Sequence, residues 1–368
     1  MSAESPPPEA AFKHWFNAAR YRRIADELSA LSPGFNRRKF LALTLEGLEE
    51  RALMDRLRQT ARAYQAALPG AYRDKLDVLR AFAPKVDHAF VAISVGDFVA
   101  REGLHDPAHS LEALREITRY GSSEFAVRPF LQCDLHGTLD VMETWAHDSD
   151  EHVRRLASEG SRPRLPWGLR LKELVQDPRP TGPILEALKR DPALYVRKSV
   201  ANHLNDIAKD HPGAVLDRVE GWDRSAPETD WIARHALRTL IKRGEPRALA
   251  VMGVAAKTAI EVKAFSVSPR RVALGGKIEL RAEVVSTSRR PQTLVVDYVI
   301  HYVKASGGTS PKVFKWSVVS LGPGERVVWV KRQQIRDFTT RRHYAGSHRV
   351  ELQINGARPA SDHFVLRR

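Results

Sequence analysis

Apolar residues recur at helical spacing through the first 257 residues. Stretches such as FKHWFNAARYRRIADELSAL (12–31) and RRKFLALTLEGLEERALMDRLRQTARAYQAAL (37–68) carry an apolar side chain every three or four positions, and proline or glycine separates the segments. This spacing predicts an all-helical domain from residue 11 to residue 257. The acidic, proline-rich start predicts a disordered leader over residues 1–10.

A weak internal repeat runs through the second half of this helical region. The segments DEHVRRLASE, ALYVRKSVAN and DWIARHALRT are anchored at Val153, Val196 and Ile232, which lie 43 and 36 residues apart. Such spacings are typical of paired-helix repeats of the HEAT or armadillo kind, which stack into an α-solenoid. The acidic turns DSDE and RDP precede two of the anchors and would cap the helices that follow.

The periodicity changes to short alternating runs over residues 258–368. Seven runs predict strands, and turn signals such as SGGTSP and GPGE separate them: IEVKAFSV, KIELRAEVV, TLVVDYVIHYV, VFKWSVVSL, RVVWVKRQQI, HRVELQI and HFVLR. Seven strands in about 110 residues predict a C-terminal all-β immunoglobulin-like sandwich, and a fibronectin-type sandwich fits equally well.

Charge favours a polyanionic partner. The chain has 59 Lys and Arg against 44 Asp and Glu, a net charge of +15; residues 258–368 hold 20 basic and 8 acidic side chains and so carry +12 of it. No segment has the length of a membrane span or the layout of a signal peptide, so we expect a cytoplasmic monomer that does not bind membranes. The single cysteine, Cys133, rules out an internal disulfide.

Polar side chains occupy equivalent positions after the three repeat anchors. They are Arg154, Arg155, Glu159, Arg197, Lys198, Asn202, Arg234 and Arg238. Residues four apart share a helix face, as Arg234 and Arg238 would, so these side chains predict a grid on the concave surface that could follow a phosphate backbone. The alternative is an ordinary solvated face with i,i+4 ion pairs.

Three acids and a tryptophan lie among these cations. Glu159, Arg162, Arg164 and Trp167 share the awkward corner LASEGSRPRLPWGLR (156–170), and we expect this corner, with Arg162 and Arg164, to contact DNA. Asp206 continues the stripe of Lys198 and Asn202, and Glu124 follows two serines. Carboxylates stabilise the sugar cation that develops when an N-glycosidic bond breaks, and an indole face adds cation–π attraction. Taken singly, Glu124 could instead cap a helix, and Trp167 could belong to the core.

Adjacent basic pairs lead to the hypothesis that the sandwich is a second DNA-binding element. The pairs are Arg270 with Arg271, Arg289 with Arg290, Lys331 with Arg332, and Arg341 with Arg342. Two neighbours at a strand end cannot both point into a sandwich core, so most of these side chains should face solvent. Loops gathered at one end of the sandwich could then clamp a duplex; the alternative is that the charges only maintain solubility.

Other chemistries lack support. ALGGKIEL has two glycines and a lysine but not the full phosphate-loop pattern, and the 14 histidines show no H-E-x-x-H or paired spacing. We therefore expect no metal and no cofactor, and a structural role for His203.

Four segments resemble a known enzyme family: EFAVRPF, VRRLASEGSRPRLPW, SVANHLNDIAKDHP and WIARHALRTLIKRG. They resemble the DNA alkylation-repair glycosylases of the HEAT-like superfamily, and the appended sandwich resembles the AlkC branch rather than the AlkD branch. The resemblance implies base excision repair of cationic N3-alkylated bases, 3-methylcytosine and 3-methyladenine, in duplex DNA without conventional base flipping.

The resemblance also implies that Glu124, Glu159, Asp206 and Trp167 are the catalytic residues. The alternative function is a non-catalytic helical-repeat scaffold that binds nucleic acid or protein. A scaffold has no need of carboxylates among phosphate-binding arginines, and release of free methylated base from alkylated DNA distinguishes the two.

Overall fold

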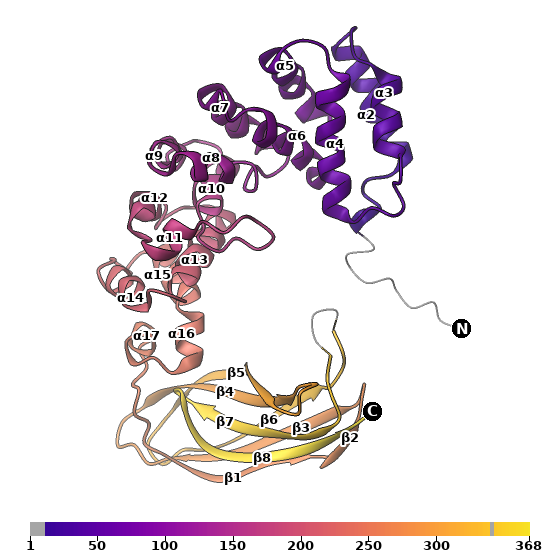
Figure 1. Cartoon of the computed structure of the whole chain (residues 1–368). Helices are drawn as coiled ribbons and strands as arrows, with labels where there is room; N and C mark the ends of the chain where they lie inside the picture. The colour runs from indigo at the N-terminus through magenta and orange to yellow at the C-terminus, as the bar shows by residue number, and fades with distance from the viewer. Residues whose placement is uncertain (1–11, 339–341) are drawn as a thin grey trace. The chain divides into compact units, whose positions relative to one another are not determined.

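The computed structural model describes residues 12–338 and 342–368, and the chain divides into two compact units. The first contains the residues up to His211 together with Trp222–Ala236. The second contains Pro212–Gly221 and Leu237–Arg368. The predicted leader, residues 1–10, lies outside the described residues. The predicted change from helices to an all-β sandwich is confirmed (Figure 1).

Helices form the whole first unit among the described residues. Their bounds are α2 (Ala18–Leu31), α3 (Arg37–Leu45), α4 (Leu53–Ala67), α5 (Tyr72–Phe82), the 3-10 helix η1 (Ala83–Lys85), α6 (Ala89–Glu102), α7 (Pro107–Ile117), α8 (Arg128–Cys133), α9 (Leu135–Trp145), α10 (Glu151–Gly160), α11 (Lys172–Gln176), η2 (Arg179–Thr181), α12 (Gly182–Ala187), α13 (Leu194–Ile207) and α15 (Pro227–Ala236).

The three repeat anchors explain how the later helices stack. Val153 on α10, Val196 on α13 and Ile232 on α15 are fully buried, and α13 packs against both α10 and α15. The predicted acidic cap is found on α10, where the Asp150 carboxylate accepts the His152 N–H. On α13 the expectation is wrong, because Asp191 accepts the N–H of Ala193, the residue at the cap position itself.

The second unit combines three helices with the sandwich. Its helices are α14 (Pro212–Glu220), α16 (Arg238–Arg243) and α17 (Pro246–Val251). Gln353 donates to the Lys242 carbonyl at 2.8 Å and Asn355 to that of Ala255 at 2.7 Å. These bonds explain why α16 and α17 belong with the sandwich, although we expected the helical domain to reach residue 257.

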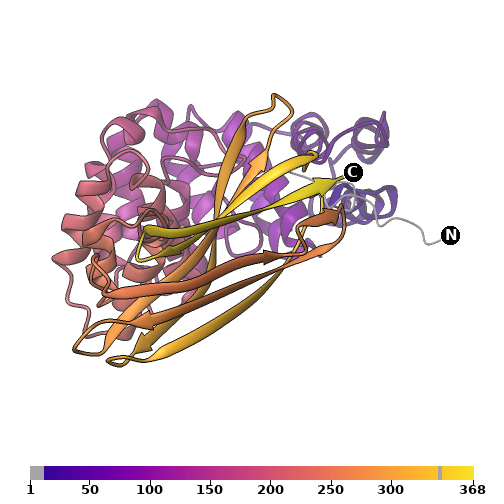
Figure 2. The same ribbon diagram turned by 90° about the horizontal axis from the view of Figure 1, so that it is seen from below.

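The sandwich has eight strands among the described residues, not the expected seven (Figure 2). They are β1 (Ile260–Ser268), β2 (Arg271–Ala273), β3 (Lys277–Ser286), β4 (Gln292–Val303), β5 (Thr309–Leu321), β6 (Arg326–Gln334), β7 (Gly346–Ile354) and β8 (Ala357–Arg367). One sheet has the order β1-β3-β6 and the other β2-β8-β7-β4-β5. The unexpected strand β2 is three residues long and pairs in parallel with the end of β8, so it is too short to show an alternating pattern.

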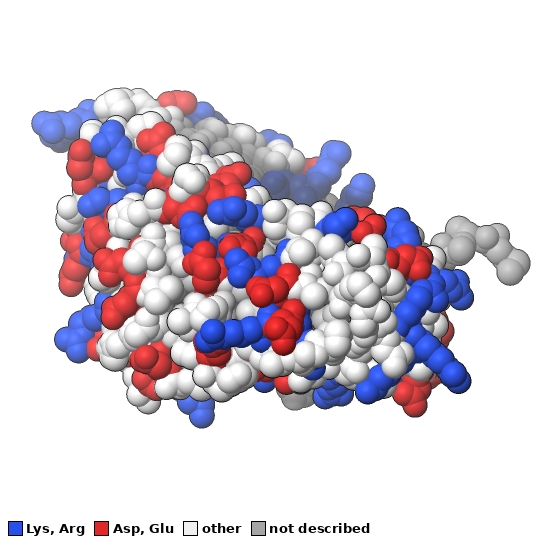
Figure 3. All heavy atoms as spheres, turned by 90° about the horizontal axis from the view of Figure 1, so that it is seen from above, with Lys and Arg blue, Asp and Glu red and all other residues white. Residues whose placement is uncertain are grey.

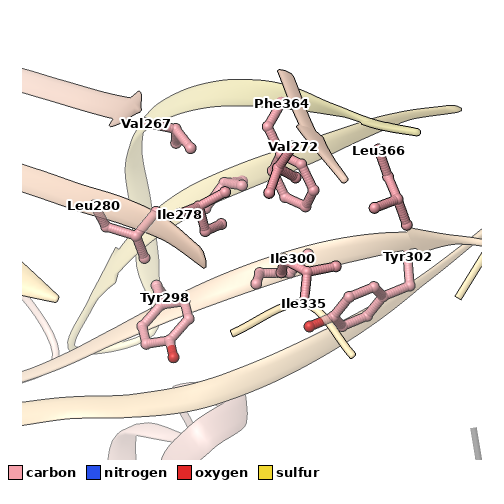
Figure 4. Close-up of a cluster of buried hydrophobic side chains, with 11 residues drawn as sticks. Val267, Val272, Ile278, Leu280, Tyr298, Ile300, Tyr302, Ile335, Phe364 and Leu366 are labelled. Carbon is pink, nitrogen blue, oxygen red and sulfur yellow. The ribbon is translucent and has the colours of Figure 1, made fainter. Parts of the chain in front are cut away.

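Side chains from both sheets fill the space between them. Figure 4 shows Leu280 and Ile278 of β3 opposite Tyr298 and Ile300 of β4, with Phe364 of β8 in the same cluster. These positions alternate with more exposed ones along β3, as expected for a strand with one buried face. No helix within residues 12–338 and 342–368 is long and apolar enough to cross a membrane.

Candidate active site

The first unit brings the three predicted acids close to a shared pair of arginines. Glu124 lies in the turn before α8, Glu159 on the last turn of α10, and Asp206 on the last turn of α13. Arg155 is 2.6 Å from Glu124 (Nη2 to Oε2) and 3.7 Å from Glu159 (Nη2 to Oε1). The α10 backbone places Arg155 one turn before Glu159, so this arginine connects the first two acids.

Arg162 connects the second acid to the third. Its Nη1 lies 2.5 Å from Glu159 Oε1, and its Nη2 lies 2.7 Å from Asp206 Oδ2. Arg162 is only 7% exposed, while Glu159 and Asp206 are 6% and 3% exposed. We expected Arg162 to contact DNA, but its burial between two carboxylates makes it part of the acid cluster.

Further polar groups form hydrogen bonds and an ion pair with the three acids. Ser199 donates to Glu159 at 2.6 Å, and the ammonium of Lys209 binds Asp206 at 2.8 Å. Ser122 donates to Glu124 at 2.9 Å. The capping alternative for Glu124 is wrong, because α8 has no side-chain cap and begins four residues later.

The carboxylates keep the two bridging arginines charged. Burial acts to lower the pKa of Arg155, but the carboxylates of Glu124 and Glu159 outweigh it, so this pKa lies above its ordinary value. For Arg162 burial acts in the same direction, and Glu159 and Asp206 again raise the pKa. The cluster is therefore an alternating network of anions and cations, in which each buried charge has a partner of opposite sign.

The corner after α10 presents Trp167 to solvent. The residue is 63% exposed, which excludes the alternative of a core tryptophan, and its backbone has a φ of 63°. This left-handed conformation is rare for a bulky residue and persists only where the surroundings hold it. Arg164 forms a two-pronged ion pair with Asp210, with both bonds at 2.8 Å, and so ties the corner to the residues after α13.

The remaining cations predicted on the helical repeats differ in their partners and in their burial, so they are less regular than the grid that we expected. Arg154 binds Asp191 at 2.6 Å, and Arg197 donates to the carbonyls of Asp191 and Pro192. Lys198 is exposed and Asn202 is half-buried, both on α13. Figure 3 shows one face of the molecule, on which basic and acidic side chains are interspersed.

One expected pair on a single helix does not form. Arg234 lies on α15 and pairs with Asp230, but α15 ends at Ala236, and Arg238 is the first residue of α16 in the second unit. The helical periodicity continues across Leu237, whereas the backbone there breaks the helix. The expectation that Arg234 and Arg238 lie on one helix is therefore wrong.

The basic pairs of the sandwich do not gather at one end. Ser268 pairs with Glu279 and Ile260 with Ser286, so the β1–β3 connection with Arg270 and Arg271 lies at the end opposite Arg289 and Arg290. These four side chains are exposed, as expected. Arg342 precedes β7, whose first residue pairs near the end of β8, on the side of β2. The expected clustering at a single end is therefore wrong, and Arg341 lies outside the described residues.

Lys331 and Arg332 also depart from expectation. They lie within β6 rather than at a strand end, and Arg332 pairs with Glu279 on β3 at 3.0 Å. A cross-strand ion pair of this kind stabilises the sheet and competes with any phosphate contact.

Arg128 is the residue that sequence reasoning missed. It is fully buried at the start of α8, and burial, together with the neighbouring Arg162 guanidinium, lowers its pKa to about 10. Its segment EFAVRPF contributes to the family resemblance, but nothing in that resemblance assigned a role to this arginine. An arginine among apolar residues, directly before a proline, was the available signal that the side chain is buried. Among the described residues, no group of three or more His, Cys, Asp or Glu has a metal-binding arrangement.

Comparisons with known proteins cover nearly the whole chain. Residues 261–368 match the family model described as the C-terminal Ig-like domain of the uncharacterised protein YhaZ. The chain is 39% identical over 348 residues to the uncharacterized protein YhaZ of Bacillus subtilis (strain 168), spanning 94% of this chain and 97% of that protein. It is also similar to the solved structure of Pseudomonas fluorescens alkylpurine DNA glycosylase AlkC bound to DNA containing an abasic site analog. That likeness has a TM-score of 0.95 and 47% identity, and covers 97% of this chain and 99% of the other.

Proposed function

The chain belongs to the AlkC-type family of HEAT-like DNA alkylation-repair glycosylases, and from that membership we propose that it is itself a DNA glycosylase. Its proposed substrates are cationic N3-alkylated bases, 3-methyladenine and 3-methylcytosine, in duplex DNA. The observation that carries this proposal is the buried cluster of Glu124, Glu159 and Asp206 near the exposed Trp167 corner.

The proposed reaction needs little from the protein besides electrostatics. When the bond between sugar C1′ and the base nitrogen breaks, both electrons leave with the base, and a base that was cationic departs neutral. Water then adds to C1′ and loses a proton. Carboxylates stabilise the positive charge that develops on the sugar, and a carboxylate that orients the water also accepts its proton. Protonation of the leaving base is not required.

The contacts of the three acids support different roles for them. Glu159 is contacted by both bridging arginines, Arg162 and Arg155, and also accepts a bond from Ser199, so we assign it to positioning. Glu124 and Asp206 each pair with only one of the bridging arginines, and Asp206 Oδ1 faces the Lys209 ammonium, so we assign these two to the sugar and the water. Trp167 would place its indole face against the developing cation, worth about 0.5 to 2 kcal/mol.

Cations on both units are the proposed contacts to the DNA backbone. On the helical repeats these are Lys198 and Arg234. On the sandwich they are Arg270, Arg271, Arg289, Arg290 and Arg342. We propose that the alkylated base is recognised without being extruded from the duplex. A site of buried acids near an exposed corner is consistent with this mode of recognition.

Base release is the experiment that tests the function. Purified protein is incubated with duplex DNA that carries 3-methyladenine or 3-methylcytosine, and free base is measured under single-turnover conditions. We expect release by the wild-type protein and loss of release in Glu124→Gln with DNA binding retained, because an amide cannot stabilise a cation as a carboxylate does. A yield no greater than that of heat-inactivated protein refutes the proposal and favours a non-catalytic scaffold.

A further inference from the structure

Arg128 forms three hydrogen bonds from a side chain that is fully buried. Its Nε donates to the Leu169 carbonyl at 2.6 Å, and its Nη1 donates to those of Gly160 at 2.7 Å and Arg162 at 2.9 Å. All three acceptors are backbone carbonyls, so no carboxylate neutralises this guanidinium directly. Its Nη2 is buried and has no hydrogen-bond partner among the described residues.

These three carbonyls are the two ends of the corner that carries Trp167. Gly160 and Arg162 precede Trp167 in the chain, and Leu169 follows it. Between Pro163 and Leu171 the backbone forms two bonds of its own, from Gly168 N–H to the Leu165 carbonyl at 3.2 Å and from Leu171 N–H to the Pro163 carbonyl at 3.3 Å. The bonds donated by the charged Arg128 guanidinium are shorter than these two backbone bonds. Arg128 therefore forms the strongest connection between the two ends of the corner.

Packing at the same place leaves the corner little freedom. A Cβ at Gly160 would lie 2.6 Å from Val127, and one at Gly168 would lie 3.3 Å from the Arg128 side chain. The corner thus rests directly on the start of α8. Between these supports Trp167 keeps its left-handed φ of 63°, a conformation that a tryptophan would leave if it were not held.

The position of Arg128 also relates the corner to the acids. Arg128 follows Glu124 by four residues, and the Arg162 carbonyl that it binds belongs to the residue whose side chain bridges Glu159 and Asp206. One buried guanidinium therefore fixes the distance between the Glu124 turn, the Arg162 bridge and the exposed indole. It does so without reaching solvent, and hence without contacting DNA.

We propose that Arg128 is a positioning residue of the active site, which holds the Trp167 corner in its left-handed conformation and in register with the three acids. This inference rests on the proposed glycosylase function for its catalytic consequence, but not for its structural part. Removing the guanidinium should loosen the corner and lower the rate of base excision while leaving the affinity for DNA nearly unchanged.

Arg56 provides a matched control for the test. It is also buried, at 1% exposed, and also donates to three backbone carbonyls, those of Arg51, Lys13 and Phe16, in the N-terminal helices. Arg128→Met and Arg56→Met therefore each remove a buried guanidinium that binds three carbonyls, and Arg56→Met also removes a 3.4 Å ion pair with the exposed Glu49. Any difference between them beyond thermal stability reports the position of Arg128 rather than the burial of an arginine.

The experiment measures three quantities on the full chain, at a temperature where both variants are folded by circular dichroism. Hydrogen exchange of residues 160–171 should become faster in Arg128→Met and stay unchanged in Arg56→Met. The single-turnover excision rate should fall about 10- to 100-fold in Arg128→Met only, with the dissociation constant for DNA within about threefold of wild type. Arg128→Lys, which keeps a charged donor, should recover part of the rate.

The outcomes separate this inference from the proposed function. Unchanged exchange in the corner of Arg128→Met overturns the positioning role, and so does an excision rate that falls equally in both methionine variants. If the wild-type protein releases no base, the function fails, while the exchange comparison still decides whether Arg128 holds the corner.

Discussion

Asp297 on β4 gives the sandwich a pH-dependent stability. The residue is 3% exposed, and burial of its carboxyl raises the pKa from 3.8 to about 6, with Lys242, Lys315 and Gln353 offsetting only part of the effect. A group whose pKa is higher in the folded state favours folding in its protonated form. Its contribution is therefore complete below about pH 4 and is lost as the pH rises through about 6.

The size of this effect follows from the shift itself. A difference of about two pKa units corresponds to roughly 3 kcal/mol between the protonated and the ionised form. At pH 8 the buried Asp297 carboxylate is ionised in the wild-type protein, and this destabilises the folded state. Asp297→Asn replaces that carboxylate with a neutral amide of nearly the same shape, so the variant should be more stable at pH 8 by up to about 3 kcal/mol. At pH 4 the two proteins should be nearly equal.

Urea unfolding followed by circular dichroism at pH 4, 6 and 8 measures the difference. Glu261→Gln is a suitable control, because Glu261 lies on the same unit with its side chain 56% exposed beside Lys263. An exposed pair of this kind contributes at most about 1 kcal/mol. A stability gain of Asp297→Asn that is the same at pH 4 and pH 8, or absent at both, would refute the reasoning.

Three further predictions concern the site and the DNA contacts. Asp206→Asn should reduce single-turnover excision by roughly 100-fold or more with DNA binding retained, whereas Asp210→Asn, which removes the partner of Arg164, should cost less; equal rates in both would contradict the role of Asp206. Trp167→Gly should melt no lower than wild type, since glycine accepts a φ of 63° without strain, yet should excise base more slowly; a clear drop in melting temperature would show that the indole stabilises the fold. Replacing both Arg289 and Arg290 with serine should flatten the plot of log binding constant against log salt by about 0.9 for each phosphate that is no longer neutralised, and an unchanged slope would exclude these two arginines from the DNA interface.

Sequence periodicity identified the architecture because it reports local geometry. Helical spacing ends and strand alternation begins near residue 257, and the repeat anchors Val153, Val196 and Ile232 are all buried. The segments around Glu159, Trp167 and Asp206 carry the family resemblance because they are long and specific. Short elements leave no such signal: β2 is three residues long, and the break at Leu237 between Arg234 and Arg238 does not interrupt the apolar pattern.

What each charged side chain contacts was decided only by the tertiary structure. The sequence identified Arg162 as basic and next to a corner, but its role depends on Asp206, 44 residues away, which the packing of α10 against α13 brings within 2.7 Å. Arg128 shows the same limit, since its three acceptors are carbonyls 32 to 41 residues further along the chain. In the sandwich, the antiparallel pairing of β1 with β3 places the loop of Arg270 and Arg271 at the end opposite the loop of Arg289 and Arg290. Periodicity records which face of an element is buried, whereas the partner of a buried charge depends on which elements meet, and that is a property of the folded chain alone.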